Sequence, residues 1–264
     1  MSAFPASAPV SDIVARLRAA GCVFAEDEAR LLIDAARSPA HLEEIVRRRV
    51  EGTPLEVIVG WVEFCGRRIA VDAGVFVPRQ RSTFVVRQAV ERARPGAVVV
   101  DLCCGAGALG AAIAAAVGGV RLHASDIEPA AVRCARRNLD AVGGRVYEGD
   151  LYDPLPLSLR GRVDILVANA PYVPTDEIAM MPPEARDHEP LVALDGGPDG
   201  VDVHRRVASG APLWLAPGGH LLIETSEHQA PLTVAAMADH GLLPRVVTSD
   251  ELYCTVVIGT KPAL

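Results

Sequence analysis

The sequence lacks cysteine pairs at metal-binding or redox spacing. None of its six cysteines forms a Cys-x-x-Cys pair, and no two of its seven histidines stand at the spacing of zinc ligands. The segment Met1–Val10 has neither the basic nor the apolar region of a secretory leader. We therefore expect no metal site and no disulfide framework, and we predict a cytoplasmic protein.

The sequence has no excess of positive charge either. Its 26 basic residues face 33 acidic ones, which gives a formal net charge of −7. Because non-specific binding to nucleic acid depends on neutralising phosphates, we predict no stable binding to nucleic acid. Half of the residues are apolar and 22% are charged, a balance that excludes disordered and collagen-like chains. We expect a globular monomer.

A membrane-spanning segment is also missing. The stretch Leu102–Val120 carries no charge and is long enough to cross a bilayer. It contains five glycines, however, half of its other residues are alanine, and no aromatic anchors flank it. We therefore predict a buried strand, turn and helix here, and no association with a membrane.

The first part of the chain predicts helices and a hairpin. Residues 1–10 resemble a loose tail, and residues 11–50 place apolar side chains at helical spacing. A breaker at 51–54 precedes two short strands, 60–64 and 68–71, that flank a turn at Gly66. We predict three units: a helical N-terminal domain (1–57), a linking β-hairpin (58–77) and a large domain (78–264).

From Pro95 onward, apolar segments rich in valine and isoleucine alternate with helical patterns. This alternation predicts an α/β fold with a mostly parallel sheet that helices cover on both faces. The last two strands are joined by residues 248–252, too short for a crossover helix, so the final strand should be antiparallel. The predicted strands are 97–102, 120–125, 145–147, 163–168, 220–224, 243–247 and 253–259, and the predicted helices are 108–117, 129–142, 201–215 and 229–240.

The sharpest local motif is Asp101–Gly110, which closes a strand and opens a helix. Gly105 and Gly107 would let the backbone come close to a ligand near the free N–H groups of the helix start. Asp126 ends the next strand, where a carboxylate can accept hydrogen bonds from ribose hydroxyls. Together these features predict a nucleotide-like ligand, whereas the glycines alone would also fit a turn that packs helix against strand.

Two ligands fit this loop, a dinucleotide and S-adenosylmethionine. Asp101 would repel a pyrophosphate, but it is favourable near the ammonium and sulfonium of S-adenosylmethionine. Asp150 follows the third strand and can accept a hydrogen bond from the adenine amine, with Leu151 beside it. We favour S-adenosylmethionine. A dinucleotide oxidoreductase stays open as an alternative, although no residues for hydride transfer are visible.

A second motif ends the fourth strand, where Asn169-Ala170-Pro171-Tyr172 reaches the ligand-binding edge of the sheet. The Asn169 side-chain oxygen and a neighbouring backbone carbonyl can accept both hydrogens of a planar NH2 group, and Tyr172 can stack on that group. Such positioning would aim the nitrogen at a methyl group without a strong base. We predict Asn169 and Tyr172 as catalytic residues, and all four residues as the substrate-binding tetrapeptide.

These motifs together resemble the class I S-adenosylmethionine-dependent methyltransferases that modify planar amides and amines. The segments 51–56, 77–79 and 186–200 more specifically resemble the protein-glutamine methyltransferases that act on peptide-chain release factors. The resemblance implies a Rossmann-like sheet, methylation of a glutamine in the Gly-Gly-Gln loop of a release factor, and N-terminal helices that help to dock this partner. The cofactor-binding residues that we predict are Asp101, Cys103, Gly105, Gly107, Asp126, Asp150, Leu151 and Asn169.

The sequence departs from this family at three places. Ala170 replaces the first proline of the family's Asn-Pro-Pro-Tyr, which keeps a backbone carbonyl but loses a fixed φ. Acidic residues usually follow Pro78-Arg79, whereas here Arg81 and Thr83 are found, and Cys103 stands where glycine is common. Two alternatives therefore stay open: methylation of the exocyclic amine of adenine in RNA or DNA, and a catalytically weak paralogue that acts as a binding protein.

Overall fold

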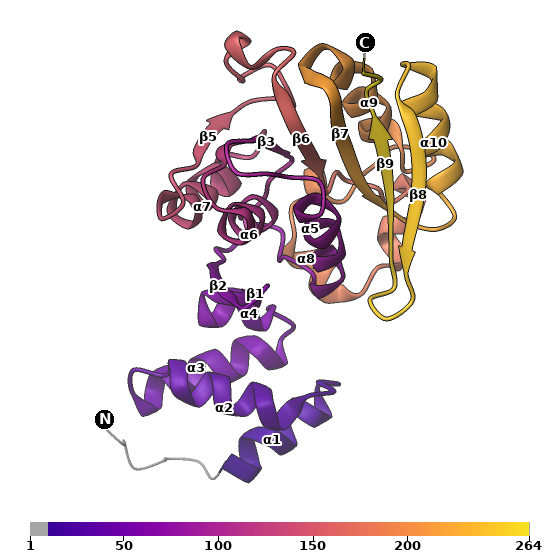
Figure 1. Cartoon of the computed structure of the whole chain (residues 1–264). Helices are drawn as coiled ribbons and strands as arrows, with labels where there is room; N and C mark the ends of the chain where they lie inside the picture. Colours follow the sequence, from indigo (N-terminus) through magenta and orange to yellow (C-terminus); the bar gives the residue numbers. More distant parts are fainter. Residues whose placement is uncertain (1–9, 264) are drawn as a thin grey trace.

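The computed structural model describes residues 10–263 (Figure 1). Most of the predicted tail, residues 1–9, lies outside the described residues, and Val10 begins the first helix. No helix in the described range is both long and apolar enough to cross a membrane. The stretch 102–120 instead forms the end of a strand, a turn and a helix, as the sequence predicts.

Four helices form the N-terminal part: α1 (Val10–Ala19), α2 (Ala25–Ala35), α3 (Pro39–Val50) and the short α4 (Leu55–Val59). Their apolar faces meet in a small core of their own, around Leu17, Leu32 and Ile45, set apart from the sheet (Figure 1). The side chain of Ser38 caps α3 by accepting a hydrogen bond from the backbone N–H of His41. The helices predicted for residues 11–50 are therefore confirmed.

A hairpin connects these helices to the rest of the chain. Strands β1 (Trp61–Phe64) and β2 (Arg67–Ala70) pair antiparallel, with Phe64 opposite Arg67. The two turn residues, Cys65 and Gly66, both have positive φ, the conformation that two-residue hairpin turns favour. Phe64 and Ile69 are buried in the same core as one face of the large sheet, which fastens the hairpin to the large domain.

The seven-stranded sheet has the order β5-β4-β3-β6-β7-β9-β8. Its strands are β3 (Val98–Leu102), β4 (Arg121–Asp126), β5 (Arg145–Glu148), β6 (Val163–Ala168), β7 (Leu215–Thr225), β8 (Leu243–Ser249) and β9 (Cys254–Thr260). The pairs from β5 to β7 are parallel, and β9 is antiparallel to both of its neighbours. The predicted fold class is therefore confirmed, including the antiparallel last strand.

Helices cover both faces of this sheet (Figure 1). One face packs with α5 (Thr83–Val90), α6 (Ala108–Val117) and α7 (Pro129–Asp140), and the other with α9 (Asp202–Trp214) and α10 (Ala230–Asp239). Side chains alternate between the two cores along each strand, so that Val99 faces α6 while Val98 and Val100 face the other core.

The long segment after β6 contains elements that the sequence does not predict. These are η3 (Thr175–Met180), α8 (Pro183–His188) and η4 (Leu191–Ala193), and two further short turns of helix, η1 (Gln80–Ser82) and η2 (Leu157–Leu159), occur elsewhere. Helix α5 is also absent from the sequence prediction. Strand β7 begins at Leu215, five residues before the predicted start, and a register shift accompanies its pairing with β6.

Arg49 connects the N-terminal helices to the segment after β6. Its guanidinium is almost fully buried and donates to Glu28 on α2 at 2.6 Å, and it also pairs with Glu184 on α8. A third hydrogen bond reaches the carbonyl of Thr53 at 3.3 Å. Because Glu28 is buried too, its carboxylate depends on this arginine for compensation.

We expect Arg49→Met to lower the free energy of unfolding by about 3–5 kcal/mol, because the Glu28 carboxylate would stay buried without a partner. Urea denaturation measures this loss. The second substitution Glu28→Gln should recover most of it by removing the unpaired charge. Arg47→Met, which breaks only exposed pairs on the same helix, should leave the midpoint unchanged. Equal losses in Arg49→Met and Arg47→Met would contradict the prediction.

Candidate active site

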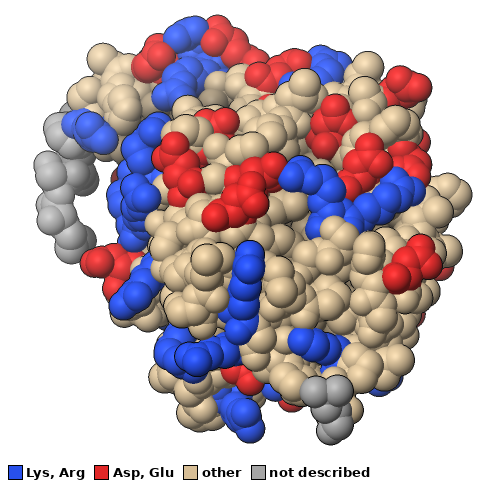
Figure 2. Space-filling view, turned by 90° about the horizontal axis from the view of Figure 1, so that it is seen from above, with Lys and Arg blue, Asp and Glu red and all other residues tan. Residues whose placement is uncertain are grey.

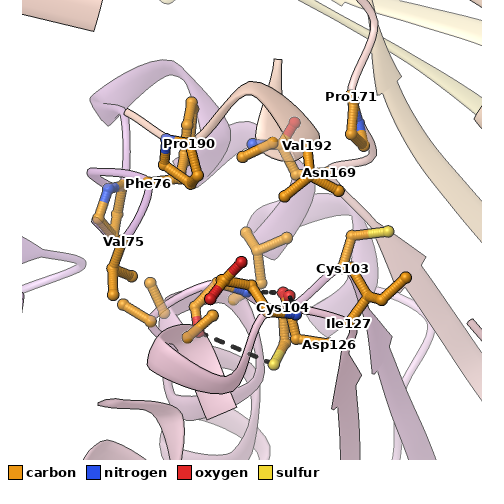
Figure 3. Close-up of a pocket in the computed structure, with 18 of the residues that line it drawn as sticks. Val75, Phe76, Cys103, Cys104, Asp126, Ile127, Asn169, Pro171, Pro190 and Val192 are labelled. Carbon is orange, nitrogen blue, oxygen red and sulfur yellow. Dashed lines mark hydrogen bonds between the residues drawn. The ribbon is translucent and has the colours of Figure 1, made fainter. Parts of the chain in front are cut away.

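The carboxyl ends of four parallel strands surround one cavity. The loop after β3 contributes Gly105, the end of β4 contributes Asp126, the segment after β5 contributes Asp150, and Asn169 follows β6. In Figure 3, Asp126 and Cys104 lie on one side of this cavity and Asn169 and Val192 on the other. We call it the first cavity. It brings together most of the residues that the sequence predicts for a cofactor.

Gly105 turns its backbone toward the first cavity. Its φ is +54°, and a Cβ atom added there would meet no other atom within 4 Å. Its N–H donates to the Asp126 carboxylate at 2.8 Å, and the other oxygen of that carboxylate accepts from the N–H of Glu128 at 2.9 Å. Burial raises the pKa of Asp126. This carboxylate therefore fixes the loop and still lines the cavity with its remaining lone pairs.

Gly107 and Asp101 lie outside the first cavity, unlike our sequence-based prediction. Gly107 starts α6 with a φ of +77°, and an added Cβ would come within 3.1 Å of Leu139 on α7, so this glycine serves helix packing. Asp101 is buried behind the loop. One of its oxygens accepts from the N–H of Gly110 at 2.9 Å, and the other has no partner among the described residues. Neither residue is among those that line this cavity.

Cys103, Asp150 and Leu151 do line the first cavity. Cys103 and Leu151 both have positive φ, 53° and 46°, which explains why glycine is common at the position of Cys103. The hydroxyl of Ser125 donates to the Leu151 carbonyl at 2.7 Å and holds this strained segment in place.

Helix α9 adds two residues to the cavity that the sequence motifs do not reveal. Val203 and Arg206 stand three positions apart, on one side of the helix, and both line the first cavity. Arg206 donates to the Asp150 carboxylate at 2.6 Å. The predicted acceptor for the adenine amine therefore already has a cationic partner.

A second cavity adjoins the first. Both are lined by Phe76, Asn169, Pro171 and Ala193, so the start of the tetrapeptide stands between them. Ala170 and Tyr172 line only the second cavity. The side-chain nitrogen of Asn169 lies 3.4 Å from the hydroxyl of Ser82, a weak hydrogen bond that leaves the carboxamide oxygen free to accept from a ligand.

Tyr172 is fixed by residues from two distant segments. Its hydroxyl accepts from Arg81 at 2.6 Å and lies 3.4 Å from a carboxylate oxygen of Glu224, and its carbonyl accepts from the side chain of Gln229 at 2.7 Å. Burial raises the pKa of the Tyr172 hydroxyl, so this group is neutral at physiological pH. None of the three partners is visible as a site residue in the sequence.

A buried carboxylate fastens the wall of the second cavity. Glu189 accepts from the N–H of Val77 at 3.1 Å and from Arg79 at 2.7 Å, and it lines this cavity. Burial raises its pKa, and the Arg79 guanidinium partly opposes that rise. The segment after the tetrapeptide is thereby tied to the segment that follows the hairpin.

Known proteins resemble the chain along most of its length. The release factor glutamine methyltransferase of Geobacter sulfurreducens is 35% identical over 219 residues, 82% of this chain and 76% of that protein. The chain belongs to the release factor glutamine methyltransferase family. The family profile described as methyltransferase small domain matches residues 68–181, which include both motifs.

Two further comparisons describe the breadth of this similarity. A protein of Streptomyces pristinaespiralis, named 4-amino-L-phenylalanine/4-methylamino-L-phenylalanine methyltransferase, is 37% identical over 72% of this chain and 67% of its own length. The crystal structure of a methyltransferase from Pyrococcus furiosus aligns with a TM-score of 0.57 at 16% identity, covering 75% of this chain and 90% of that one. The second likeness concerns the fold alone.

We expect the free energy of unfolding to decrease as the pH rises from about 4 to about 8, because burial raises the pKa of Asp101 from 3.8 to about 8. In this range the folded state keeps a proton that the unfolded chain releases. Asp101→Asn keeps an acceptor for the N–H of Gly110 but cannot ionise, so its stability should fall less over this range. Urea denaturation at several pH values tests this, and identical slopes for both proteins would refute it.

Proposed function

We propose that this protein transfers a methyl group from S-adenosylmethionine to the side-chain amide nitrogen of a glutamine in a peptide-chain release factor. The observation that carries the proposal is the position of Asn169, whose side chain borders both cavities. The first cavity would hold the donor and the second the glutamine. A methyl group can pass directly only between neighbouring sites of this kind.

The residues of the first cavity fit S-adenosylmethionine. The open space beside Gly105 admits a ligand close to the backbone, and the Asp126 carboxylate suits ribose hydroxyls. The carboxylates of Asp126, Glu128 and Asp150 face a single arginine, Arg206, in this lining, which favours a cationic ligand over a pyrophosphate. When bound, S-adenosylmethionine supplies an electrophilic methyl group on a sulfonium.

The residues of the second cavity would grip the amide. The Asn169 carboxamide oxygen and the Ala170 carbonyl would accept its two hydrogens, while the neutral ring of Tyr172 packs against the amide plane. Hydrogen bonds of this kind localise the nitrogen lone pair and aim it toward the first cavity. The chain's own contribution is thus positioning and electrostatic stabilisation.

The N-terminal helices would help to dock the release factor. Arg49 joins them to Glu184, and Glu184 also lines the second cavity. A partner that contacts these helices would therefore lie beside the opening through which the glutamine enters.

Other methyl acceptors have less support. On the face seen in Figure 2, acidic and basic side chains mix over the upper part and basic ones predominate lower down, while the net charge of −7 does not favour a nucleic-acid substrate. The Streptomyces pristinaespiralis relative is named as a methyltransferase of 4-amino-L-phenylalanine. This amino acid is therefore a more informative alternative acceptor to test than a nucleic acid.

The direct test incubates the purified protein with radiolabelled S-adenosylmethionine and, in separate reactions, a release factor, total RNA and 4-amino-L-phenylalanine. We expect label on the release factor, and mass spectrometry should place one added methyl group on the glutamine of its Gly-Gly-Gln loop. Label that appears only on RNA or only on the amino acid would overturn the proposal.

We expect Asn169→Ala to lower kcat for release-factor methylation by about 100-fold, comparable to the loss of one transition-state hydrogen bond in a closed site. Single-turnover assays measure this loss. Ser82→Ala removes only the 3.4 Å contact to Asn169 and should cost far less. Should both variants lose the same activity, Asn169 would owe its importance to the contact with Ser82 rather than to the substrate.

A further inference from the structure

Two consecutive residues of η1 contact the two ends of the tetrapeptide. Ser82 lies beside the side chain of Asn169 at its start, and Arg81 donates to the hydroxyl of Tyr172 at its end. Arg81 also lines the second cavity, with 43% of its side chain exposed. This single turn of helix therefore spans the residues that would hold the methyl acceptor.

Arg81 bridges Tyr172 to a buried acid. Its Nε donates to Glu224 at 3.1 Å while one of its terminal nitrogens donates to Tyr172 at 2.6 Å, and the guanidinium carbon lies 6.0 Å from the centre of the tyrosine ring. A planar guanidinium can make both contacts at once, which a lysine ammonium on a flexible stem does less well.

Glu224 is the anchor of this arrangement. Its side chain, near the end of β7, is 1% exposed. Among residues 10–263, Arg81 is the only basic residue within ion-pair distance of it. The ionisable groups that face it are Arg81 from η1, Tyr172 from the loop after β6 and Cys254 from β9. Without Arg81, the site would hold a buried carboxylate and no cation to balance it.

We infer that Arg81 is a positioning residue for methyl transfer, which fixes the ring of Tyr172 against the second cavity by joining its hydroxyl to the rigid end of β7 through Glu224. The inference rests on the proposed function. The hydroxyl of Tyr172 then has one donor and one acceptor, so the ring cannot swing about the Cα–Cβ bond to another rotamer without breaking both contacts. Gln229 fixes the backbone of the same residue.

The test is a double-mutant cycle in full-length protein with Arg81→Met, Tyr172→Phe and the double variant, assayed on a release factor. If Arg81 acts through the tyrosine hydroxyl, each single variant should lower kcat by about tenfold, the size expected when a charged hydrogen bond is lost. The double variant should fall no more than about twofold further, because both changes remove one interaction. The KM for the release factor and the affinity for S-adenosylhomocysteine should change less than kcat.

Arg205→Met is the matched control. Its side chain is also 43% exposed and also pairs with carboxylates, those of Asp199 and Asp202, but it lines neither cavity. We expect its kcat to stay within about twofold of the wild type.

A second double variant separates positioning from simple charge compensation. Arg81→Met with Glu224→Gln removes the buried carboxylate that Arg81 balances, and it serves if the single variant fails to fold. If Arg81 positions Tyr172, this double variant should still show a lowered kcat.

The outcomes separate the two hypotheses. Suppose that the wild-type protein methylates the release factor, but the double variant loses kcat by the product of the two single losses. That result would overturn this inference and leave the proposed function standing. Full recovery of kcat in Arg81→Met/Glu224→Gln would do the same, since Arg81 would then only balance charge. A wild-type protein with no activity on the release factor would overturn the proposed function and, with it, this inference.

Discussion

The site depends on one constraint: strand β6 ends beside the end of strand β3 in the sheet. Because the two strands are parallel neighbours, Asn169 and the loop of Gly105 emerge at the same edge of the sheet, and both line the first cavity. Both strands are buried along their lengths and paired on both sides, so the two segments start from a rigid platform. A transfer over the length of one bond needs donor and acceptor held to within fractions of an ångström, and a strand end meets this need better than a long loop.

The two cavities handle buried charge in different ways. In the first cavity, burial raises the pKa of Asp126, and hydrogen bonds from the backbone N–H groups of Gly105 and Glu128 oppose that rise. Around the second cavity, Glu189 is paired with Arg79 and Glu224 with Arg81, and both arginines come from one short segment after the hairpin. The lining of the first cavity has three carboxylates and one arginine, and that of the second has three carboxylates and two arginines, so the proposed site of the cationic donor is the more negative of the two.

The sequence predicted the features that show as a repeated pattern or as a short motif along the chain. Near-continuous apolar segments that alternate with helical patterns located the strands of the sheet. The motifs after β3, β4, β5 and β6 lie close together because parallel strands end at one edge. A motif cannot tell which glycine faces a ligand, so Gly107 was assigned to the cofactor although it packs against α7. Arg81, Arg206 and Glu224 come from distant elements, and only the folded chain brings them to the motifs. Helix α5 was missed because its β-branched residues weaken the helical signal that packing on the sheet restores.

The departures at positions 170 and 81 belong together in physical terms. A proline would hold the tetrapeptide through its fixed φ, and Ala170 gives up that restraint. In its place the surroundings hold the loop: Ala170 itself is almost fully buried, Gln229 fixes the carbonyl of Tyr172, and Arg81 fixes its hydroxyl. These contacts differ from the pyrrolidine ring of a proline, because their strength also depends on the charge balance between Arg81 and Glu224. The rigidity of this tetrapeptide is therefore a property of the folded site, whereas a proline would supply it within the local chain.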